Sequence, residues 1–367
     1  MKAWVLHGIG DIRLETVEDP LPGEGQALIR VKAAGICGSD IPRIYRTGAY
    51  SHPLVPGHEL SGIVETVGAG VSDTWRGQRV GIFPLIPCGV CEPCRKKQFE
   101  MCRKYGYIGS RSNGGFAQYV TVPENSLLKL PEQVSYEEAA MLEPMAVAVH
   151  AMRRAACSQS DVIAVCGLGT IGLFLLMFLL EAESGRSGAD KNPGETRDFV
   201  RQRDKILVIG NKEFQRRRVV ELGLPESCYC DSRTQDAGKW IMERTEGRGA
   251  DVFFECVGKN ETVTLAVKHT APAGRVVLVG NPFSDMCLEK AVYWKILRSQ
   301  LTVAGTWNSS FTQEAGDDWH YVLDRLSQRR IAPEELISHR FSLEELESGM
   351  KIMRDKTEDY VKIMGTF

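Results

Sequence analysis

One stretch of the sequence decides the fold: Asp161-Val162-Ile163-Ala164-Val165-Cys166-Gly167-Leu168-Gly169-Thr170-Ile171-Gly172. Its first half is a run of apolar residues, typical of a strand buried on both faces in a parallel sheet. Its second half is a G-x-G-x-x-G motif, which opens the apolar segment 173–180. The motif alone is weak evidence, but placed between a strand and a helix it is typical of a dinucleotide-binding turn, with the helix N-terminus facing the pyrophosphate.

The alternation of strand and helix continues after this motif. Segments 205–209, 250–258 and 274–280 are apolar strands, and 214–222 has the pattern of a helix. We therefore predict an α/β fold with a Rossmann-type, doubly wound parallel sheet over residues 151–307. Ligands of such sheets bind beyond the carboxyl ends of the strands. The predicted cofactor-binding residues are those of the glycine turns and strand ends: Gly167, Gly169, Thr170, Ile171, Gly172, Gly210, Asn211, Lys212, Cys256, Val257 and Gly280.

A polar insertion at about 183–204 lengthens the first crossover of this domain. Loops of this length inside a compact domain are usually either functional or disordered. Two interpretations stay open: a solvated excursion, and a flap that binds phosphate or contacts another subunit.

The second predicted strand ends in Gly210-Asn211-Lys212. Members of this fold that use NAD usually carry an acidic residue where Gly210 stands, and it binds the ribose 2'-hydroxyl. Asn211 and Lys212 can instead bind a 2'-phosphate, and the arginines at 216–218 add positive charge. We predict that NADP(H) is slightly favoured over NAD(H). The alternative is that NAD is still used, without the hydrogen bond that such a carboxylate would make.

The beginning of the chain has a different pattern. Alternating apolar and polar residues over roughly the first 120 positions predict a mostly β unit of short antiparallel strands. A capping-box pattern at Ser135-Tyr136-Glu137-Glu138 then predicts a helix that carries Glu143. After residue 307 the pattern is helical, and the chain closes with a strand at 360–364.

Two groups of residues in the β-rich part have the chemistry of zinc ligands. Four cysteines follow the spacing C-x2-C-x2-C-x7-C, which predicts a closed structural zinc site: Cys88, Cys91, Cys94 and Cys102. The stretches around Cys37 and His58-Glu59 combine a thiolate, an imidazole and carboxylates beside glycines. Zinc suits such a mixed set, and three protein ligands leave its fourth position open for catalysis. We predict two zinc ions per chain.

The composition describes an ordinary globular protein. The chain has 367 residues, 43% of them hydrophobic and 25% charged, with a net charge of -2. This charge gives no reason to expect nucleic acid or an anionic membrane as a partner. The longest apolar run is too short to span a bilayer, and the first residues lack the apolar region of a signal peptide. Because cysteines stand at metal-ligand spacing, we expect a reducing cytoplasm.

Five segments carry a resemblance to a known family: 37–44, 57–59, 84–88, 108–111 and 114–117. They are similar to those of the zinc-dependent medium-chain alcohol dehydrogenases of the polyol type, and most of all to the branch that acts on galactitol 1-phosphate. The resemblance covers nearly the whole chain except the insertion. It implies a GroES-like, mostly-β catalytic domain of residues 1–150 and 308–367. It further implies a catalytic zinc held by Cys37, His58 and Glu143, with water or Glu59 completing the shell.

The same resemblance implies roles for neighbouring residues. Ser39 would pass the substrate proton towards solvent, and Asp40 would orient His58. Hydride transfer from an alcohol needs this proton removed and the alkoxide stabilised, which an open zinc site does. The implied substrate is a small-molecule sugar-alcohol phosphate, oxidised to a ketose phosphate. Arg43 and Arg111 are the candidates for binding its phosphate, because guanidinium groups match phosphate oxygens.

Three alternative functions and one mode of assembly stay open. Polyol dehydrogenases of the family usually carry an Arg and an aromatic residue where this chain has Trp307-Asn308-Ser309, which argues against a plain polyol. The alternatives are a non-phosphorylated, sorbitol- or xylitol-like substrate, a threonine-type dehydrogenase, and a zinc-free nucleotide-binding relative. The apolar edge segment 301–305 predicts a homodimer or homotetramer, since pairing would cover it.

Overall fold

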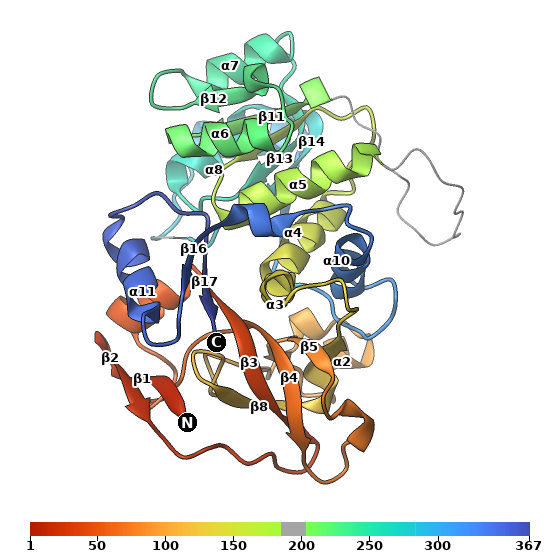
Figure 1. Cartoon of the computed structure of the whole chain (residues 1–367). Helices are drawn as coiled ribbons and strands as arrows, with labels where there is room; N and C mark the ends of the chain where they lie inside the picture. The colour runs from red at the N-terminus through yellow and green to blue at the C-terminus, as the bar shows by residue number, and fades with distance from the viewer. Residues whose placement is uncertain (185–202, 283) are drawn as a thin grey trace. The chain divides into compact units, whose positions relative to one another are not determined.

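The computed structural model describes residues 1–184, 203–282 and 284–367 (Figure 1). The insertion expected at about 183–204 lies almost entirely outside them. The described chain divides into two compact units, one made of Met1–Ala146 and Ser310–Phe367 and the other of Val147–Ser309. The final segment therefore belongs to the same compact unit as the beginning of the chain.

The first unit is built on a seven-stranded sheet and two small hairpins. The strands of the sheet are β3 (Gln26–Ile36), β4 (Glu59–Val67), β5 (Arg79–Ile82), β8 (Tyr119–Pro123), β9 (Leu127–Lys129), β16 (Ile337–Phe341) and β17 (Lys362–Thr366). Their order is β16-β17-β3-β4-β5-β9, and β8 pairs with β3. The hairpins are formed by β1 (Lys2–Gly8) with β2 (Asp11–Thr16), and by β6 (Leu85–Ile86) with β7 (Gly106–Tyr107).

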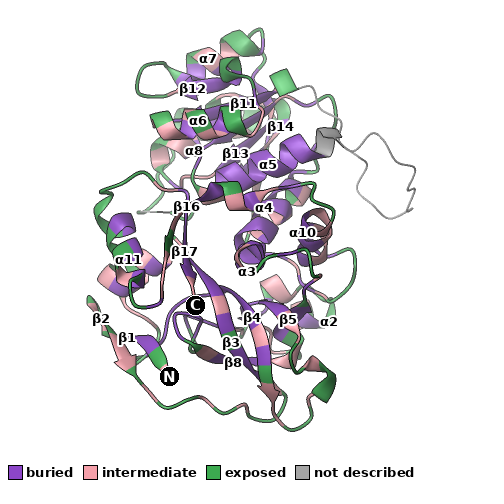
Figure 2. Cartoon of the chain, viewed as in Figure 1, coloured by how far each residue is buried: buried purple, intermediate pink, exposed green. Residues whose placement is uncertain are grey.

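Short helices connect these strands. They are α1 (Asp40–Pro42), α2 (Glu92–Arg95), α3 (Tyr136–Ala140), α10 (Asp318–Ser327) and α11 (Leu346–Asp355), with single turns at Arg43–Thr47, Asp73–Trp75, Phe99–Met101, Glu124–Ser126 and Pro333–Leu336. The core of the unit is apolar along β3 and β4, where Ile29 and Leu60 are buried, and Figure 2 shows both strands largely in the buried colour.

The capping box predicted at Ser135 is present. The Ser135 hydroxyl accepts from the amide of Glu138, and the Glu138 carboxylate accepts from the amide of Ser135. The helix that it begins ends at Ala140, however, and a separate helix, α4 (Leu142–Ala155), carries Glu143 in its first turn. Pro144 explains the break, because it has no N–H to donate to the carbonyl of Ala140.

The second unit is a parallel sheet with helices. Its strands are β10 (Ile163–Cys166), β11 (Ile206–Gly210), β12 (Tyr229–Asp231), β13 (Ala250–Glu255), β14 (Thr270–Leu278) and β15 (Thr302–Gly305). Their order is β12-β11-β10-β13-β14-β15, and every pair in it is parallel. The helices are α5 (Thr170–Ser184), α6 (Glu213–Glu221), α7 (Ala237–Arg244), α8 (Asn260–Lys268) and α9 (Lys290–Arg298), with single turns at Arg203–Lys205 and Glu226–Cys228. This is the strand order of the doubly wound dinucleotide-binding fold, so the predicted fold is confirmed.

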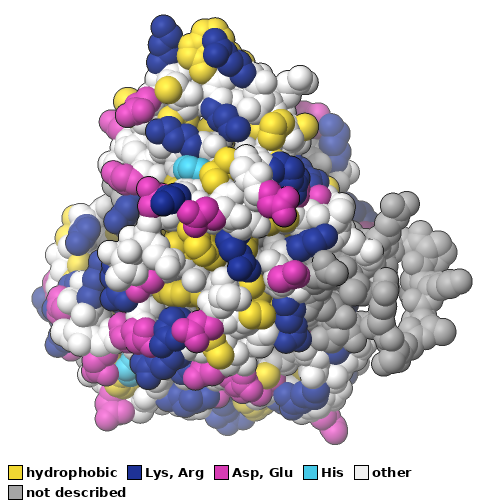
Figure 3. Space-filling model, turned by 90° about the horizontal axis from the view of Figure 1, so that it is seen from above, with side chains coloured by type: hydrophobic (Ala, Val, Ile, Leu, Met, Phe, Trp, Pro, Cys, Tyr) yellow, Lys and Arg dark blue, Asp and Glu magenta, His cyan; other side chains and the backbone are white. Residues whose placement is uncertain are grey.

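The surface carries charges of both signs. On the face drawn in Figure 3, basic and acidic side chains are interspersed, in keeping with the net charge of -2. None of the helices in the described part of the chain combines the length and the apolar character needed to cross a bilayer.

Candidate metal centres and cofactor site

The pairing of β3 with β4 brings the first group of predicted ligands together. Gly35 of β3 lies opposite Glu59 of β4, so Cys37, just after β3, comes close to His58, just before β4. The ligand atoms of Cys37, His58 and Glu59 all lie within 4.8 Å of one another. Gly35 is required here, because a Cβ at this position would lie 2.2 Å from Glu59 Oε2.

The chemistry of this group fits a divalent metal ion. His58 and Glu59 are buried, with 4% and 1% of their surface exposed. Glu59 Oε1 has no hydrogen-bond partner among the described residues, which is costly for a buried carboxylate oxygen without a cation. One thiolate, one imidazole and one carboxylate are a donor set that zinc accepts with a fourth position open.

Neighbouring polar groups hold the three residues in place. Asp40 Oδ2 accepts from the amide of Cys37 at 3.0 Å, and Asp40 Oδ1 lies 3.4 Å from His58 Nδ1. The Ser39 hydroxyl donates to Cys37 Sγ at 3.3 Å. Burial alone would lower the pKa of His58, but the charges of Asp40 and Cys37 raise it well above its usual value.

Lys362 is a member of this centre that the sequence analysis missed. Its side chain is 2% exposed, and its ammonium group lies 2.5 Å from Glu59 Oε2 and also donates to the carbonyl of Ile36. It reaches the centre because β17 pairs with β3, with Ile363 opposite Ile36. A lysine at the start of an apolar terminal strand was the only signal in the sequence.

Glu143 lies beside this group but is not one of the three. Its Oε1 accepts a hydrogen bond of 3.0 Å from the hydroxyl of Tyr107. Burial raises the pKa of Glu143, with a further contribution from Glu59. Tyr107, also missed in the sequence, packs the edge of its ring against His58 with 5.7 Å between centroids.

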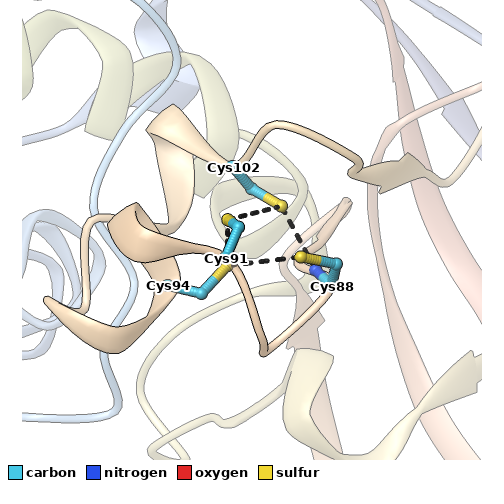
Figure 4. Close-up of side chains that lie close together, drawn as sticks. All are labelled: Cys88, Cys91, Cys94 and Cys102. Atoms are coloured by element: carbon cyan, nitrogen blue, oxygen red, sulfur yellow. Dashed lines mark hydrogen bonds between the residues drawn. The ribbon is translucent and has the colours of Figure 1, made fainter.

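The second group of predicted ligands forms a compact cluster in the loop between β6 and β7. The sulfur atoms of Cys88, Cys91, Cys94 and Cys102 lie within 4.8 Å of one another (Figure 4). All four are free thiols, and 3.4 Å separates the sulfurs of Cys91 and Cys94. Backbone amides of Arg103 and Cys94 lower the pKa of Cys91 to about 6, whereas burial raises the pKa of Cys94 to about 12. Four thiolates fit a closed zinc site.

The glycine motif has the geometry of a nucleotide-binding turn. Gly167 follows β10 with φ +98°, and a Cβ on Gly172 would lie 1.9 Å from the carbonyl oxygen of Gly167. Gly169 is exposed, and a Cβ there would meet nothing within 4 Å, which leaves room for a ligand near the backbone. Thr170 and Ile171 begin α5. The remaining predicted residues, Cys256, Val257 and Gly280, follow the ends of β13 and β14.

The turn after β11 explains why no carboxylate stands at position 210. A Cβ on Gly210 would lie 2.6 Å from the Tyr229 hydroxyl and 2.8 Å from Gln215 Oε1. Gln215 is buried and accepts from the amide of Asn211 at 2.9 Å, while its amide group donates to the carbonyl of Leu168 at 3.1 Å. A glutamine thus joins the turn of the second strand to the glycine motif.

The positive charge expected near this turn is partly neutralised. Arg216 forms ion pairs with Glu213 and Glu226, and Arg218 pairs with Glu221. Lys212 lies over the ring of Phe214, 5.2 Å from its centroid. Lys212 directly follows Asn211 in this turn, and this position is what supports a role for it in binding a 2'-phosphate.

The two candidate phosphate-binding arginines have different surroundings. Arg43 Nη1 donates to Asp40 Oδ1 at 2.5 Å, and only 17% of its side chain is exposed. Arg111 is exposed and lies between two aromatic rings, 4.1 Å from the centroid of Tyr50 and 4.6 Å from that of Tyr105. The guanidinium of Arg43 is therefore paired with Asp40. The guanidinium of Arg111 contacts the faces of two aromatic rings and is exposed to solvent.

Sequence comparison adds independent information. Residues 23–132 match the family described as "Alcohol dehydrogenase GroES-like domain", and residues 203–328 match "Zinc-binding dehydrogenase". Galactitol 1-phosphate 5-dehydrogenase of Escherichia coli K12 is 30% identical over 352 residues, with 96% of each chain covered. L-idonate 5-dehydrogenase of Vitis vinifera is 32% identical over 93% of this chain and 87% of its own.

Solved structures of similar proteins lead to the same family. Galactitol-1-phosphate dehydrogenase of Escherichia coli has a TM-score of 0.86 and 29% identity, with 100% of both chains covered. A zinc-binding dehydrogenase of Sinorhizobium meliloti bound to NADP has a TM-score of 0.85 and 26% identity over 100% of this chain and 99% of its own. A dehydrogenase of Escherichia coli CFT073 complexed with NADH has a TM-score of 0.84, 26% identity and the same coverage. The chain belongs to the zinc-binding, medium-chain alcohol dehydrogenase family.

Proposed function

We propose that this enzyme transfers a hydride between a nicotinamide cofactor and a sugar-alcohol phosphate, as in the conversion of galactitol 1-phosphate to tagatose 6-phosphate. The observation that carries the proposal is the buried group of Cys37, His58 and Glu59, with Glu59 Oε1 lacking a partner among the described residues. These three residues would hold a zinc ion with one position open to a hydroxyl group. When bound, zinc supplies Lewis acidity there, which makes an alcohol easier to deprotonate.

The surrounding side chains have distinct tasks in this proposal. Asp40 accepts a hydrogen bond from the backbone amide of Cys37 and faces His58 Nδ1 at 3.4 Å, so its carboxylate would orient both proposed ligands. Lys362 balances the charge of Glu59. The Ser39 hydroxyl, which donates to Cys37 Sγ, can rotate to accept the proton of a substrate hydroxyl and pass it to water.

Arg111 is the proposed anchor for the substrate phosphate, and Arg43 is not. The stack of Arg111 between Tyr50 and Tyr105 fixes the plane of the guanidinium, which reduces the conformational entropy lost on binding an anion. Arg111 also lies in the same turn as Tyr107, since its amide donates to the Tyr107 carbonyl. Arg43 serves the orientation of Asp40.

A free polyol is the second candidate substrate. The observation that favours it is the ion pair of Arg43 with Asp40, which leaves Arg111 as the one exposed candidate for the phosphate. Sorbitol dehydrogenase of Bacillus subtilis, which is named for a polyol without phosphate, is 26% identical over 99% of this chain and 96% of its own. A ketose product without phosphate would follow from the same zinc chemistry.

Cofactor preference and assembly complete the proposal. NADP(H) is slightly favoured because Lys212 can bind a 2'-phosphate and no carboxylate at Gly210 repels one. A second copy of the chain covers β15, an edge strand whose Val303 is 42% exposed, together with Trp294 and Leu297 of α9, which are 42% and 52% exposed. The free thiols suit a reducing compartment such as the cytoplasm.

The decisive experiment compares galactitol 1-phosphate with galactitol by nicotinamide absorbance. A charge-assisted hydrogen bond to phosphate is worth roughly 1.5–3 kcal/mol, so kcat/KM should favour the phosphorylated substrate by about ten- to a hundredfold or more. Arg111→Ala should raise KM for galactitol 1-phosphate and leave activity on galactitol unchanged. Arg76→Ala, which removes a distant exposed arginine, is the matched control. Equal efficiency on both substrates in the parent enzyme would favour the free polyol.

A further inference from the structure

Tyr107 contacts both His58 and Glu143 beside the proposed zinc centre. It ends β7, five residues after Cys102, and the β6–β7 hairpin fixes its backbone. The ring meets His58 edge-on, at an interplanar angle of 61°, while the hydroxyl donates to Glu143 Oε1 at 3.0 Å. One side chain therefore contacts a proposed ligand with its ring and a second carboxylate with its hydroxyl.

The two carboxylates have different partners. Glu59 pairs through Oε2 with Lys362, and its Oε1 faces no other donor among the described residues. Glu143 is also buried, at 8% exposure, but its Oε1 is taken by Tyr107. Only Glu59 joins Cys37 and His58 within the 4.8 Å group formed by described residues. The difference between the carboxylates is thus a difference between their hydrogen-bond partners.

We propose that Tyr107 is a positioning residue: its hydroxyl holds Glu143 outside the ligand group and so keeps the fourth zinc position open. The inference rests on the proposed zinc chemistry of this centre. Three protein ligands leave the fourth position of a zinc ion open. A second carboxylate among the ligands would fill the position that the substrate hydroxyl needs and, by donating charge to the metal, would weaken its Lewis acidity.

The Tyr107→Phe variant tests this role, because it keeps the ring against His58 and removes only the hydroxyl. With cobalt(II) in place of zinc, the visible ligand-field spectrum reports the number and type of ligands without any turnover. We expect a changed spectrum in Tyr107→Phe, because Glu143 joins the group. We also expect metal release to a chelator to slow by about tenfold or more, the worth of the hydrogen bond that held Glu143 back. In turnover, kcat should fall more than KM changes.

Two further variants make the test specific. Tyr105→Phe removes a hydroxyl from the neighbouring ring, 6.3 Å from Tyr107 between centroids, and should leave both metal readouts unchanged. Tyr107→Phe combined with Glu143→Gln should restore the spectrum of Glu143→Gln alone. The proposal is overturned if Tyr107→Phe leaves both readouts at the parent values, or if its effect is the same in the Glu143→Gln background. If His58→Ala does not reduce cobalt binding at all, the proposed zinc centre of Cys37, His58 and Glu59 is wrong. That result differs from a failure of the role proposed for Tyr107.

Discussion

The ion pair between Lys362 and Glu59 gives the sharpest test of how the catalytic centre is held. Lys362→Met keeps the length of the side chain and removes its charge. Both partners are almost fully buried, at 2% and 1% exposure, and Lys362 also donates to the carbonyl of Ile36. Burial alone would lower the pKa of Lys362, but Glu59 and Cys37 raise it, so the ammonium is charged at neutral pH.

The size of the effect follows from this burial. Removing one partner of a buried ion pair costs about 3–5 kcal/mol, because the other charge is left uncompensated. In the variant, Glu59 still lies close to His58 and to any bound cation, which partly compensate its charge. We therefore expect a loss of stability at the lower end of this range, about 3 kcal/mol. Removing Glu59's charge as well, in Lys362→Met/Glu59→Gln, should restore part of this stability, since no buried charge is then left alone.

Hydrogen exchange of the amides that join β17 to β3 is the suitable assay, because it measures the opening of this unit alone. A destabilisation of about 3 kcal/mol corresponds to exchange more than roughly a hundredfold faster. Lys351→Met is the matched control, because Lys351 pairs with Glu347 on the surface, where both side chains are exposed by 37% or more. Its effect should stay below about 1 kcal/mol. If Lys362→Met speeds hydrogen exchange no more than Lys351→Met does, the ion pair of Lys362 with Glu59 does not stabilise this unit.

Three further predictions concern pH, cofactor and assembly. Zinc binding at the Cys37 site should weaken as pH falls from about 8 to 6, because His58 must be neutral to bind zinc. Its raised pKa means that protons compete with zinc at a higher pH than they would at a free imidazole. Titrations with a metal indicator that give the same zinc affinity at each pH in this range would contradict the prediction. Lys212→Ser should shift the ratio of kcat/KM towards NAD by about fivefold, the worth of an ion pair of about 1 kcal/mol, and an unchanged ratio would remove the argument for NADP. Val303→Asp places a charge on the edge strand β15 and should halve the molecular mass of the particle measured by solution scattering. A parent protein that is monomeric at all concentrations would exclude the proposed pairing of two copies through β15.

The sequence predicted those parts that depend on local pattern. The strand and glycine turn at 161–172, the cysteine spacing and the capping box at Ser135 each lie within one short segment, and the structure contains all three. The candidate ligands Cys37 and His58 could be named because they stand beside glycines at the ends of predicted strands. The resemblance implied Glu143 as the third ligand, with water or Glu59 completing the shell, whereas the structure groups Glu59 with Cys37 and His58.

The partners of these residues could not be predicted, because they come from distant segments. Lys362 reaches Glu59 only through the pairing of the last strand with β3, and Tyr107 reaches Glu143 through a hairpin after the cysteine cluster. The ion pair of Arg43 with Asp40 was also not visible in the sequence, where Arg43 was a candidate for binding phosphate. The space at Gly210 is likewise filled by side chains, Gln215 and Tyr229, that no motif identifies.

The central claim is that the Cys37, His58 and Glu59 group holds a zinc ion that is needed for turnover, separate from the zinc of the four cysteines. Elemental analysis of purified chain, read together with its turnover, tests this most directly. We predict two zinc ions per chain in the parent enzyme, and one in His58→Ala, which should remain folded but inactive, since open-site ligands serve chemistry rather than folding. A fully active parent enzyme with a single zinc ion, or a His58→Ala variant that retains both, would contradict the account.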